Sequence, residues 1–211
     1  MKSLIFLGIV LCLLSQVSAQ EIGIRAGVDL YKFHHIDEDL WDASDNFSAS
    51  PGFGISFRMP FKERSAFRTG LFYSDVSNET DQKIVGLSQR FLKMPIQYGF
   101  TVVSEEIRSG FFLGPNLGFG LKGEHMVQGI PYNIYEEQSI LHNRFFVGFG
   151  AGIRTEYLGI CLVVQYNFDI LIPDGGFRSD TEMVLWNEIL SIYLGYSYSF
   201  AKKPHRYAGR K

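Results

Sequence analysis

The sequence predicts an all-β protein, built as an eight-stranded antiparallel up-and-down transmembrane β-barrel. The first observation is the segment 190–200, in which a large apolar or aromatic residue occupies every second position. A tilted strand needs roughly 9 to 11 residues to cross a bilayer, and this segment has that length. The second observation is that seven earlier segments show the same alternation. Because backbone groups in hydrocarbon must all be paired, such strands have to close into a barrel.

The composition is that of a single β domain. A chain of 211 residues with 22 glycines and 15% aromatic residues favours strands joined by tight turns. The formal net charge is −2, and no basic cluster occurs before residue 201. Nucleic-acid binding requires clustered positive charge, so we expect no nucleic-acid partner.

Residues 1–19 have the organisation of a secretory signal peptide. A lysine near the N-terminus precedes an apolar run over 4–14, and small or polar residues lead to a cleavage site after Ala19. The apolar run is shorter than the roughly 18 residues of a spanning helix. Cleavage removes one of the two cysteines and leaves Cys161, so we expect no internal disulfide.

The first four predicted strands are each defined by alternating faces. Residues 22–31 place isoleucine, alanine, valine and leucine on one face, and glycine, arginine and aspartate on the other. Residues 52–59 and 66–74 oppose phenylalanines and other large residues to glycine, serine and arginine. Residues 90–102 continue the pattern but include Pro95, which cannot donate to a ladder. We expect a bulge or a lost bond there.

The last four predicted strands complete the ring. Residues 110–122 alternate leucine and phenylalanine with glycine, and the glycines of 144–156 fall on the polar face, where they leave room inside. Residues 160–170 oppose aliphatic and aromatic residues to glutamine, asparagine and aspartate. The strand 190–200, within the longer segment 184–200, then pairs with the preceding strand and with the first strand.

The connections between these strands alternate in length. Outer-membrane barrels have short periplasmic turns and longer external loops. The same asymmetry here predicts an integral protein of the outer membrane with both termini in the periplasm. The long connections are 32–51, 75–89, 123–143 and 171–183, and the short ones are 60–65, 103–109 and 157–159.

Apart from Arg90, at the first position of 90–102, the charged residues of the predicted strands fall on the face opposite the apolar one. An arginine or lysine at the lipid-facing midplane costs about 2 to 4 kcal/mol, so the charged face should line the lumen. Eight strands enclose a space that side chains just fill, so we expect a plugged lumen and no large diffusion pore. The predicted lumen cluster consists of Arg25, Asp29, Arg58, Arg68, Lys93, Gln97, Asn116, Arg154, Glu156, Gln165 and Asp169, and Lys122 is expected on the same face.

Periodicity alone does not say which face is inside. The alternative is a soluble exported eight-stranded barrel of the lipocalin kind, whose apolar face would turn inward around a hydrophobic ligand. Strand length, glycines on the charged face and aromatic residues near the strand ends favour the membrane barrel. These aromatic residues are Phe57, Phe67, Phe100, Phe111 and Phe200 towards the periplasm, and Phe53, Tyr73, Phe119, Phe145 and Phe168 towards the outside.

The residues that could carry catalysis or bind a metal are poorly placed for either. All five histidines fall in predicted loops or in the tail, away from strands that could orient them: His34, His35, His125, His142 and His205. The acidic residues near His34 and His35 are typical of a solvated loop. We therefore expect no catalytic residue, no metal and no cofactor, and a structural or interaction role.

Three short motifs resemble those of a known family. They are GIRAGV at 23–28, FLKMPIQY at 91–98 and GPNLG at 114–118. With these motifs the chain resembles the PorT-like outer-membrane β-barrel proteins of the Bacteroidota over roughly residues 20–200. Some members serve the type IX secretion machinery, so the resemblance implies an outer-membrane barrel that is linked to a secretion apparatus of this kind.

The C-terminus carries two further features. The final strand ends in Tyr196, Tyr198 and Phe200, which resembles the signal read by the barrel-assembly machinery. The tail 201–211 follows, with five basic residues and no acidic one. It is either a solvated periplasmic tail or a segment that docks on anionic lipid or on a partner. The expected partners are thus outer-membrane lipid, the assembly machinery, and a periplasmic or secretion-system protein.

Overall fold

The computed structural model describes residues 21–35, 47–62, 64–79, 85–104, 107–127, 130–135, 144–171 and 185–200. No helix in these stretches is long and apolar enough to cross a membrane. The predicted signal peptide, 1–19, and the predicted basic tail, 201–211, lie outside the described residues. The strands are β1 (Glu21–His35), β2 (Ser48–Lys62), β3 (Ser65–Glu79), β4 (Val85–Ser104), β5 (Ile107–Val127), β6 (Ile130–Asn133), β7 (Phe145–Tyr157), β8 (Ile160–Leu171) and β9 (Leu185–Ser199).

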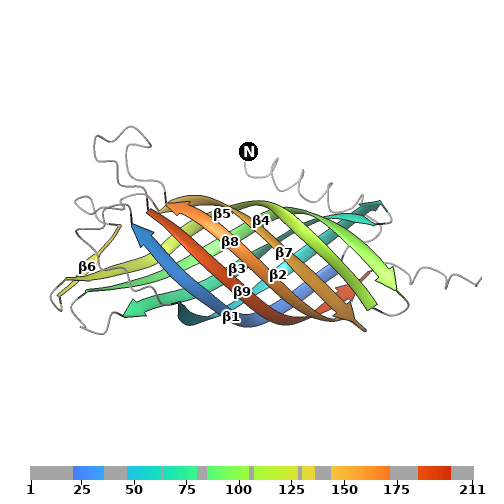
Figure 1. Ribbon diagram of the computed structural model, residues 1–211, viewed down its shortest axis with the longest axis horizontal. Helices are drawn as coiled ribbons and strands as arrows, with labels where there is room; N and C mark the ends of the chain where they lie inside the picture. The colour runs from blue at the N-terminus through green and yellow to red at the C-terminus, as the bar shows by residue number, and fades with distance from the viewer. Residues whose placement is uncertain are drawn as a thin grey trace, which may run out of the picture.

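Eight of these nine strands close into an antiparallel barrel, with β6 outside the ring (Figure 1). Each barrel strand pairs with the next along the chain, and β5 pairs with β7. The ring closes between β1 and β9, from Glu21 opposite Ser199 to His35 opposite Leu185. The predicted eight-stranded antiparallel barrel, sealed by the last strand against the first, is therefore confirmed.

The strands extend further than predicted at the end of the barrel that carries the long connections. Figure 1 shows β5 and β6 projecting beyond the ring at this end. Residues 85–89 and 123–127, which were expected in loops, pair with each other, and β6 adds to β5 from Glu124 opposite Asn133 to Val127 opposite Ile130. This extension lies beyond the apolar band of the barrel and mixes polar and apolar residues on both faces, so it carries no alternation from which strands could be predicted.

Pairing is interrupted around Pro95, as expected. On the side of β5 the ladder has a gap between the pairs Pro95–Asn116 and Tyr98–Leu113, with the same register before and after it. The disturbance is therefore a local loss of pairing and not a bulge. Gly114 lies opposite this gap with φ +156°, a conformation that side chains with a Cβ rarely adopt.

A β-bulge lies further along the same pair of strands. The register of β4 and β5 shifts between Arg90 and Phe91, so Leu121 and Lys122 are both exposed on the outer face. Lys122 pairs there with Glu124 at 2.6 Å. The expectation that Lys122 faces the lumen is wrong, because a bulge inserts one residue and inverts the alternation beyond it.

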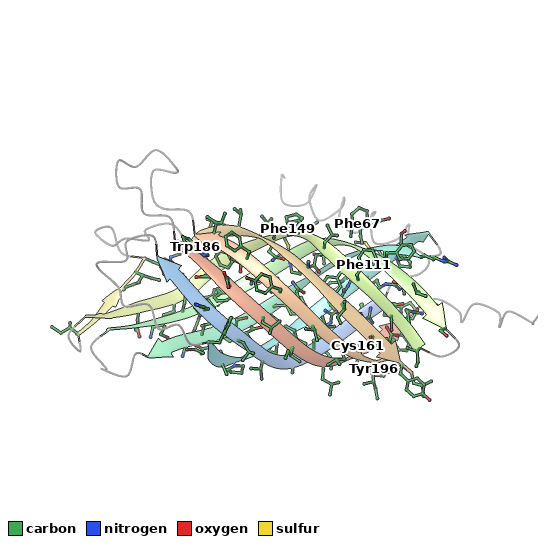
Figure 2. The ribbon with its side chains drawn as sticks, viewed as in Figure 1. Phe67, Phe111, Phe149, Cys161, Trp186 and Tyr196 are labelled. Carbon is green, nitrogen blue, oxygen red and sulfur yellow. The ribbon has the colours of Figure 1, made fainter. Side chains whose placement is uncertain are left out.

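The apolar face of the barrel points outward and the charged face points inward (Figure 2). Ile24 and Leu194 are 65% and 61% exposed, whereas Asp29 and Asp169 are 1% and 0% exposed. In Figure 2 the side chain of Phe149 is directed away from the barrel wall. A lipocalin-like barrel requires the opposite arrangement, so the structure does not favour that alternative.

Outward aromatic side chains gather towards both ends of the barrel. Such belts are typical of the two membrane–water interfaces, where aromatic rings sit at the level of the lipid head groups. They form ring pairs with centroids 5.1 Å apart for Phe53–Tyr73 and 5.0 Å for Phe119–Phe145 near the long connections, and 5.8 Å for Phe100–Phe111 and 6.2 Å for Phe67–Tyr98 near the short turns.

Candidate functional site: the barrel interior

The barrel interior is the candidate site because it holds most of the buried polar side chains. Each of them occupies an inward position of a strand whose alternate residues face outward. The predicted assembly residues Tyr196, Tyr198 and Phe200 are instead more than half exposed on the outer face. Within the predicted lumen cluster the structure buries Arg25, Asp29, Arg58, Arg68, Lys93, Gln97, Asn116, Arg154, Gln165 and Asp169, and places Glu156 partly buried near the short turns.

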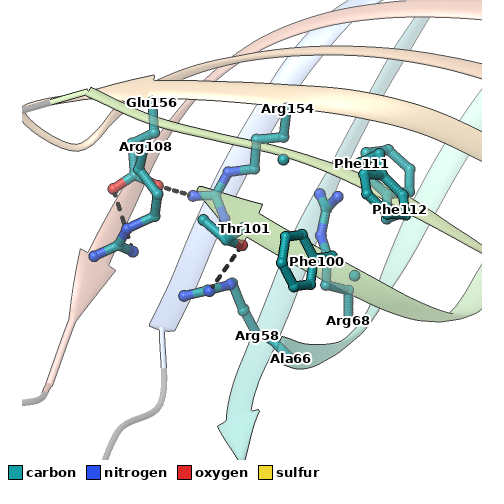
Figure 3. A pocket seen from close by; sticks show the side chains of 12 residues that line it. Arg58, Ala66, Arg68, Phe100, Thr101, Arg108, Phe111, Phe112, Arg154 and Glu156 are labelled. Atoms are coloured by element: carbon teal, nitrogen blue, oxygen red, sulfur yellow. Dashed lines mark hydrogen bonds and ion pairs between the residues drawn. The ribbon is translucent and has the colours of Figure 1, made fainter. Parts of the chain in front are cut away.

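Glu21 organises the interior at the end with the short turns. Its Oε1 accepts hydrogen bonds from Arg58 Nη1 at 2.8 Å and from Arg108 Nη1, and its Oε2 lies 3.5 Å from Arg154 Nη1. Arg154 Nη2 also donates to Glu156 Oε2 (Figure 3). Charge-assisted bonds of this kind are about twice as strong as neutral ones. They join β1, β2, β5 and β7 into one ionic network.

Two members of this network were not predicted from the sequence as lumen residues. Glu21 lies one residue before the predicted strand 22–31, and Arg108 lies two residues before the predicted strand 110–122. Both keep the inward parity of their strands, so extending each alternation past the predicted boundary would have found them.

Two further arginines occupy the middle of the lumen without a carboxylate. The guanidinium carbon of Arg68 lies 3.8 Å from the ring centroid of Phe112, and that of Arg25 lies 5.7 Å from Phe72. Among the described residues, neither arginine has a carboxylate within ion-pair distance. In the middle of the lumen, cation–π contacts therefore stand where Arg25 and Arg68 would otherwise form ion pairs. The free thiol of Cys161 is fully buried in the same region.

Asp29 is held by neutral donors. Ser74 Oγ donates to its Oδ2 at 2.5 Å, and the Tyr193 hydroxyl donates to its Oδ1 at 2.7 Å. The three residues come from β1, β3 and β9, so this cluster links the two strands that close the ring to β3, which β2 separates from β1. Hydrogen bonds to both carboxylate oxygens offset part of the cost of burying the charge.

Asp169 is held in a different way, by a cation. Lys93 Nζ lies 2.5 Å from Asp169 Oδ2, but the approach is not that of a hydrogen bond, and neither oxygen of Asp169 accepts one. Next to this pair, Asn167 Oδ1 accepts from Asn116 Nδ2 at 3.0 Å and from Gln165 Nε2 at 2.5 Å. An ion pair and an amide cluster thus lie side by side in the half of the lumen nearer the long connections.

The end of the lumen below the long connections is closed by an apolar layer. Tyr135, which follows β6, folds back over β5, where a Cβ on Gly120 would collide with its ring. Its hydroxyl accepts from Gln89 Nε2 at 2.8 Å. Burial raises the pKa of the Tyr135 phenol above its ordinary value, so the group stays neutral. The layer consists of Tyr31, Val76, Phe91, Ile134, Tyr135, Phe146 and Ile189.

Two small cavities lie inside the described part of the barrel. One cavity of ≈ 20 Å³ lies among the arginines near the short turns, and another of ≈ 20 Å³ lies beside Asp29, Lys93 and Tyr193. Water needs roughly 10–15 Å³ of such space, so each cavity holds one or two molecules. Several buried polar atoms lack a hydrogen-bond partner among the described residues, for example Gln97 Nε2 and Asn116 Oδ1. Ordered water is the physical means of satisfying such atoms.

The histidines do not build a metal site in the described part of the chain. There, no three side chains of His, Cys, Asp or Glu come together as a metal ion would require. His34, His35 and His125 were expected in loops but lie in β1 and β5, because those strands are longer than predicted. His142 and His205 lie outside the described residues.

Three solved structures are similar to this chain at low sequence identity. The structure of Ail, the attachment invasion locus protein of Yersinia pestis, is 14% identical, with 83% of this chain and 98% of that chain covered and a TM-score of 0.49. Neisserial surface protein A is 9% identical, with 84% and 97% covered and a TM-score of 0.48. The outer membrane enzyme PagL is 8% identical, with 83% and 98% covered and a TM-score of 0.47.

None of the curated proteins matches the chain in sequence. A family model described as "Outer membrane protein beta-barrel domain" matches residues 15–170, which is most of the 211-residue chain. The match covers every barrel strand except β9 and part of β8. With its outward apolar face, its closed ring and this match, the chain belongs to the outer membrane protein β-barrel domain family.

Proposed function

We propose that this protein is a structural or interaction component of the outer membrane, with a plugged lumen and no large diffusion pore. The observation that carries this proposal is the filled interior. Lys93 and Asp169 meet across the lumen from β4 and β8, and the rings of Phe72 and Tyr193, from β3 and β9, lie 5.8 Å apart. These strands are not neighbours in the ring, so their contacts occupy the space through which a solute would pass.

Planar-bilayer recording tests the plugged lumen. We expect purified, refolded protein to give no large, stable conductance under conditions in which a porin of known wide bore gives one. Reproducible nutrient-scale conductance would overturn the proposal. The variant Phe72→Ala/Tyr193→Ala removes the ring contact and serves as a matched comparison, because small conductance steps should appear or increase when the filling is reduced.

We further propose that the short turns and both termini lie in the periplasm. The described ends of the barrel support this, because Glu21 and Ser199 pair at the same end as the turn between β7 and β8. Leu158 and Ile130 are exposed at opposite ends of the protein. A membrane-impermeant maleimide should label Ile130→Cys in intact cells, and label Leu158→Cys only after the outer membrane is permeabilised. The reverse pattern would contradict this orientation.

The resemblance to PorT-like barrels supports a link to a secretion apparatus of the type IX kind. Contact with the secretion components would occur through the external connections or the tail 201–211. Before this, the assembly machinery would insert the barrel after binding its terminal aromatic signal, Tyr196, Tyr198 and Phe200. Cross-linking and affinity purification from native membranes, with and without residues 201–211, tests this link. Recovery of the same secretion components without the tail would assign the contact to the loops, and recovery of none would remove the link.

A further inference from the structure

The end of the barrel with the short turns carries an excess of positive charge around a small cavity (Figure 3). The cavity measures ≈ 20 Å³. The carboxylates that pair with its arginines in the described part of the chain are Glu21 and Glu156. Among the described residues, four guanidinium groups against two carboxylates leave two positive charges without a counterion. The four arginines that line it are Arg58, Arg68, Arg108 and Arg154.

Arg68 is the least compensated of the four. It is 6% exposed, lines the cavity, and stacks on the ring of Phe112. Within the described residues its guanidinium group has neither a carboxylate nor a hydrogen-bond acceptor, while Arg58 and Arg154 line the same cavity. A buried charge without a partner is costly, so the site is electrostatically incomplete as the protein alone builds it.

We propose that this cavity binds a small dianion of the phosphate class. Two negative charges would match the two uncompensated arginines, and the planar guanidinium fork binds phosphate oxygens in pairs. The cavity accepts one or two water-sized atoms, so one or two oxygens of the anion would take the place of water beside Arg68, and the rest of the group would lie towards Arg108, whose side chain is 33% exposed. The Thr101 hydroxyl, which accepts from Arg58 Nη2 at 3.2 Å, lies on the same wall.

The phosphate group could come from solution or from a lipid head group, and the experiment separates these sources. Calorimetric titration of the refolded protein, in a phosphate-free maltoside detergent at constant ionic strength, measures inorganic phosphate against chloride. A parallel arm measures the midpoint of urea unfolding in nanodiscs of phosphatidylcholine alone and in nanodiscs that also contain phosphatidic acid. A higher midpoint with phosphatidic acid, without binding of inorganic phosphate, would assign the site to a lipid.

The variants Arg68→Met and Arg90→Met form the matched pair. Arg90 is exposed on the outer face and pairs with Asp75 at 2.8 Å, far from the cavity along β4. We expect Arg68→Met to weaken phosphate binding roughly 10- to 100-fold, as the loss of a hydrogen bond to a charged group implies, and Arg90→Met to leave it unchanged. Arg68→Lys keeps the positive charge but loses the planar guanidinium group, so its affinity for phosphate should lie between those of Arg68→Met and Arg90→Met.

Urea unfolding gives a second measurement that does not need a calorimetric signal. Phosphate should raise the midpoint of the wild-type protein by mass action, and Arg68→Met should remove this dependence. In phosphate-free buffer Arg68→Met should be at least as stable as the wild type, because it removes an uncompensated charge. The inference is overturned if neither phosphate source acts more strongly than chloride, or if Arg90→Met loses as much binding as Arg68→Met. It holds whether or not the lumen conducts.

Discussion

Lys93 on β4 and Asp169 on β8 form a buried ion pair inside the barrel, with Nζ 2.5 Å from Oδ2. The Lys93 side chain is 8% exposed and that of Asp169 is 0% exposed. Because β5 and β7 separate the two strands in the ring, the pair spans the lumen and does not follow its wall. Within the described part of the chain Asp169 accepts no hydrogen bond, so Lys93 is the group that compensates its charge there.

Removing one partner of this pair should be far more damaging than removing both. Lys93→Met leaves the Asp169 carboxylate buried and alone, and we expect a loss of about 3 to 5 kcal/mol in the free energy of unfolding. The double variant Lys93→Met/Asp169→Leu should recover most of that loss. Urea titrations of the protein refolded in lipid vesicles measure both.

The surface pair formed by Lys122 and Glu124 is the control for this comparison. Its side chains are 56% and 43% exposed, so Lys122→Met should change the stability by at most about 1 kcal/mol. A Lys93→Met variant as stable as Lys122→Met would show that the buried pair contributes nothing specific.

Gly114 should not tolerate a side chain. Its φ of +156° and its approach to the Ile96 carbonyl oxygen leave no room for a Cβ, so Gly114→Ala should lower the unfolding free energy by about 1 to 3 kcal/mol. Gly99 on β4 is the matched control, because a Cβ there meets its nearest atom at 3.4 Å. Equal stability of the two variants in refolding titrations would contradict the proposed constraint.

The outward face should reject charge according to depth. Leu113 lies well inside the apolar band and Val102 lies near the end of β4 beside a short turn, and both are exposed on the outward face. Leu113→Arg should cost about 2 to 4 kcal/mol in a bilayer, and Val102→Arg only about 0 to 1. Refolding yield in vesicles, scored by the shift in gel mobility between heated and unheated samples, reports this difference. Equal costs at both positions would argue against a lipid-facing surface at Leu113.

Tyr135 should act as the lid of the lumen below the long connections. Tyr135→Ala removes a buried ring from the apolar layer and should destabilise the protein by about 3 to 5 kcal/mol, the cost of large-to-small core changes. Tyr135→Phe keeps the ring and loses the bond from Gln89 Nε2, so its cost should be about 0.5 to 1.5 kcal/mol. If both variants lose the same amount, the hydrogen bond and not the ring supports the lid.

Much of the barrel could be predicted because alternation along a strand is a local property. Ile24 and Arg25 face opposite sides whatever the rest of the chain does, so the inward set could be written down residue by residue. The prediction failed where this local rule is broken. The bulge at Leu121 turned Lys122 outward, and the extension of β4 and β5 beyond the membrane band left no alternation to follow.

The sequence by itself determined the number of barrel strands and the face of each strand residue up to the bulge at Leu121, and it favoured an outward apolar side because a charge in lipid is costly. The tertiary structure alone decided which inward residues meet. Alternation sets a side but not the stagger of one strand against the next, and the stagger accumulates around the closed ring. Glu21 therefore meets Arg154, Lys93 meets Asp169, and Arg68 is left beside Phe112 without an anion.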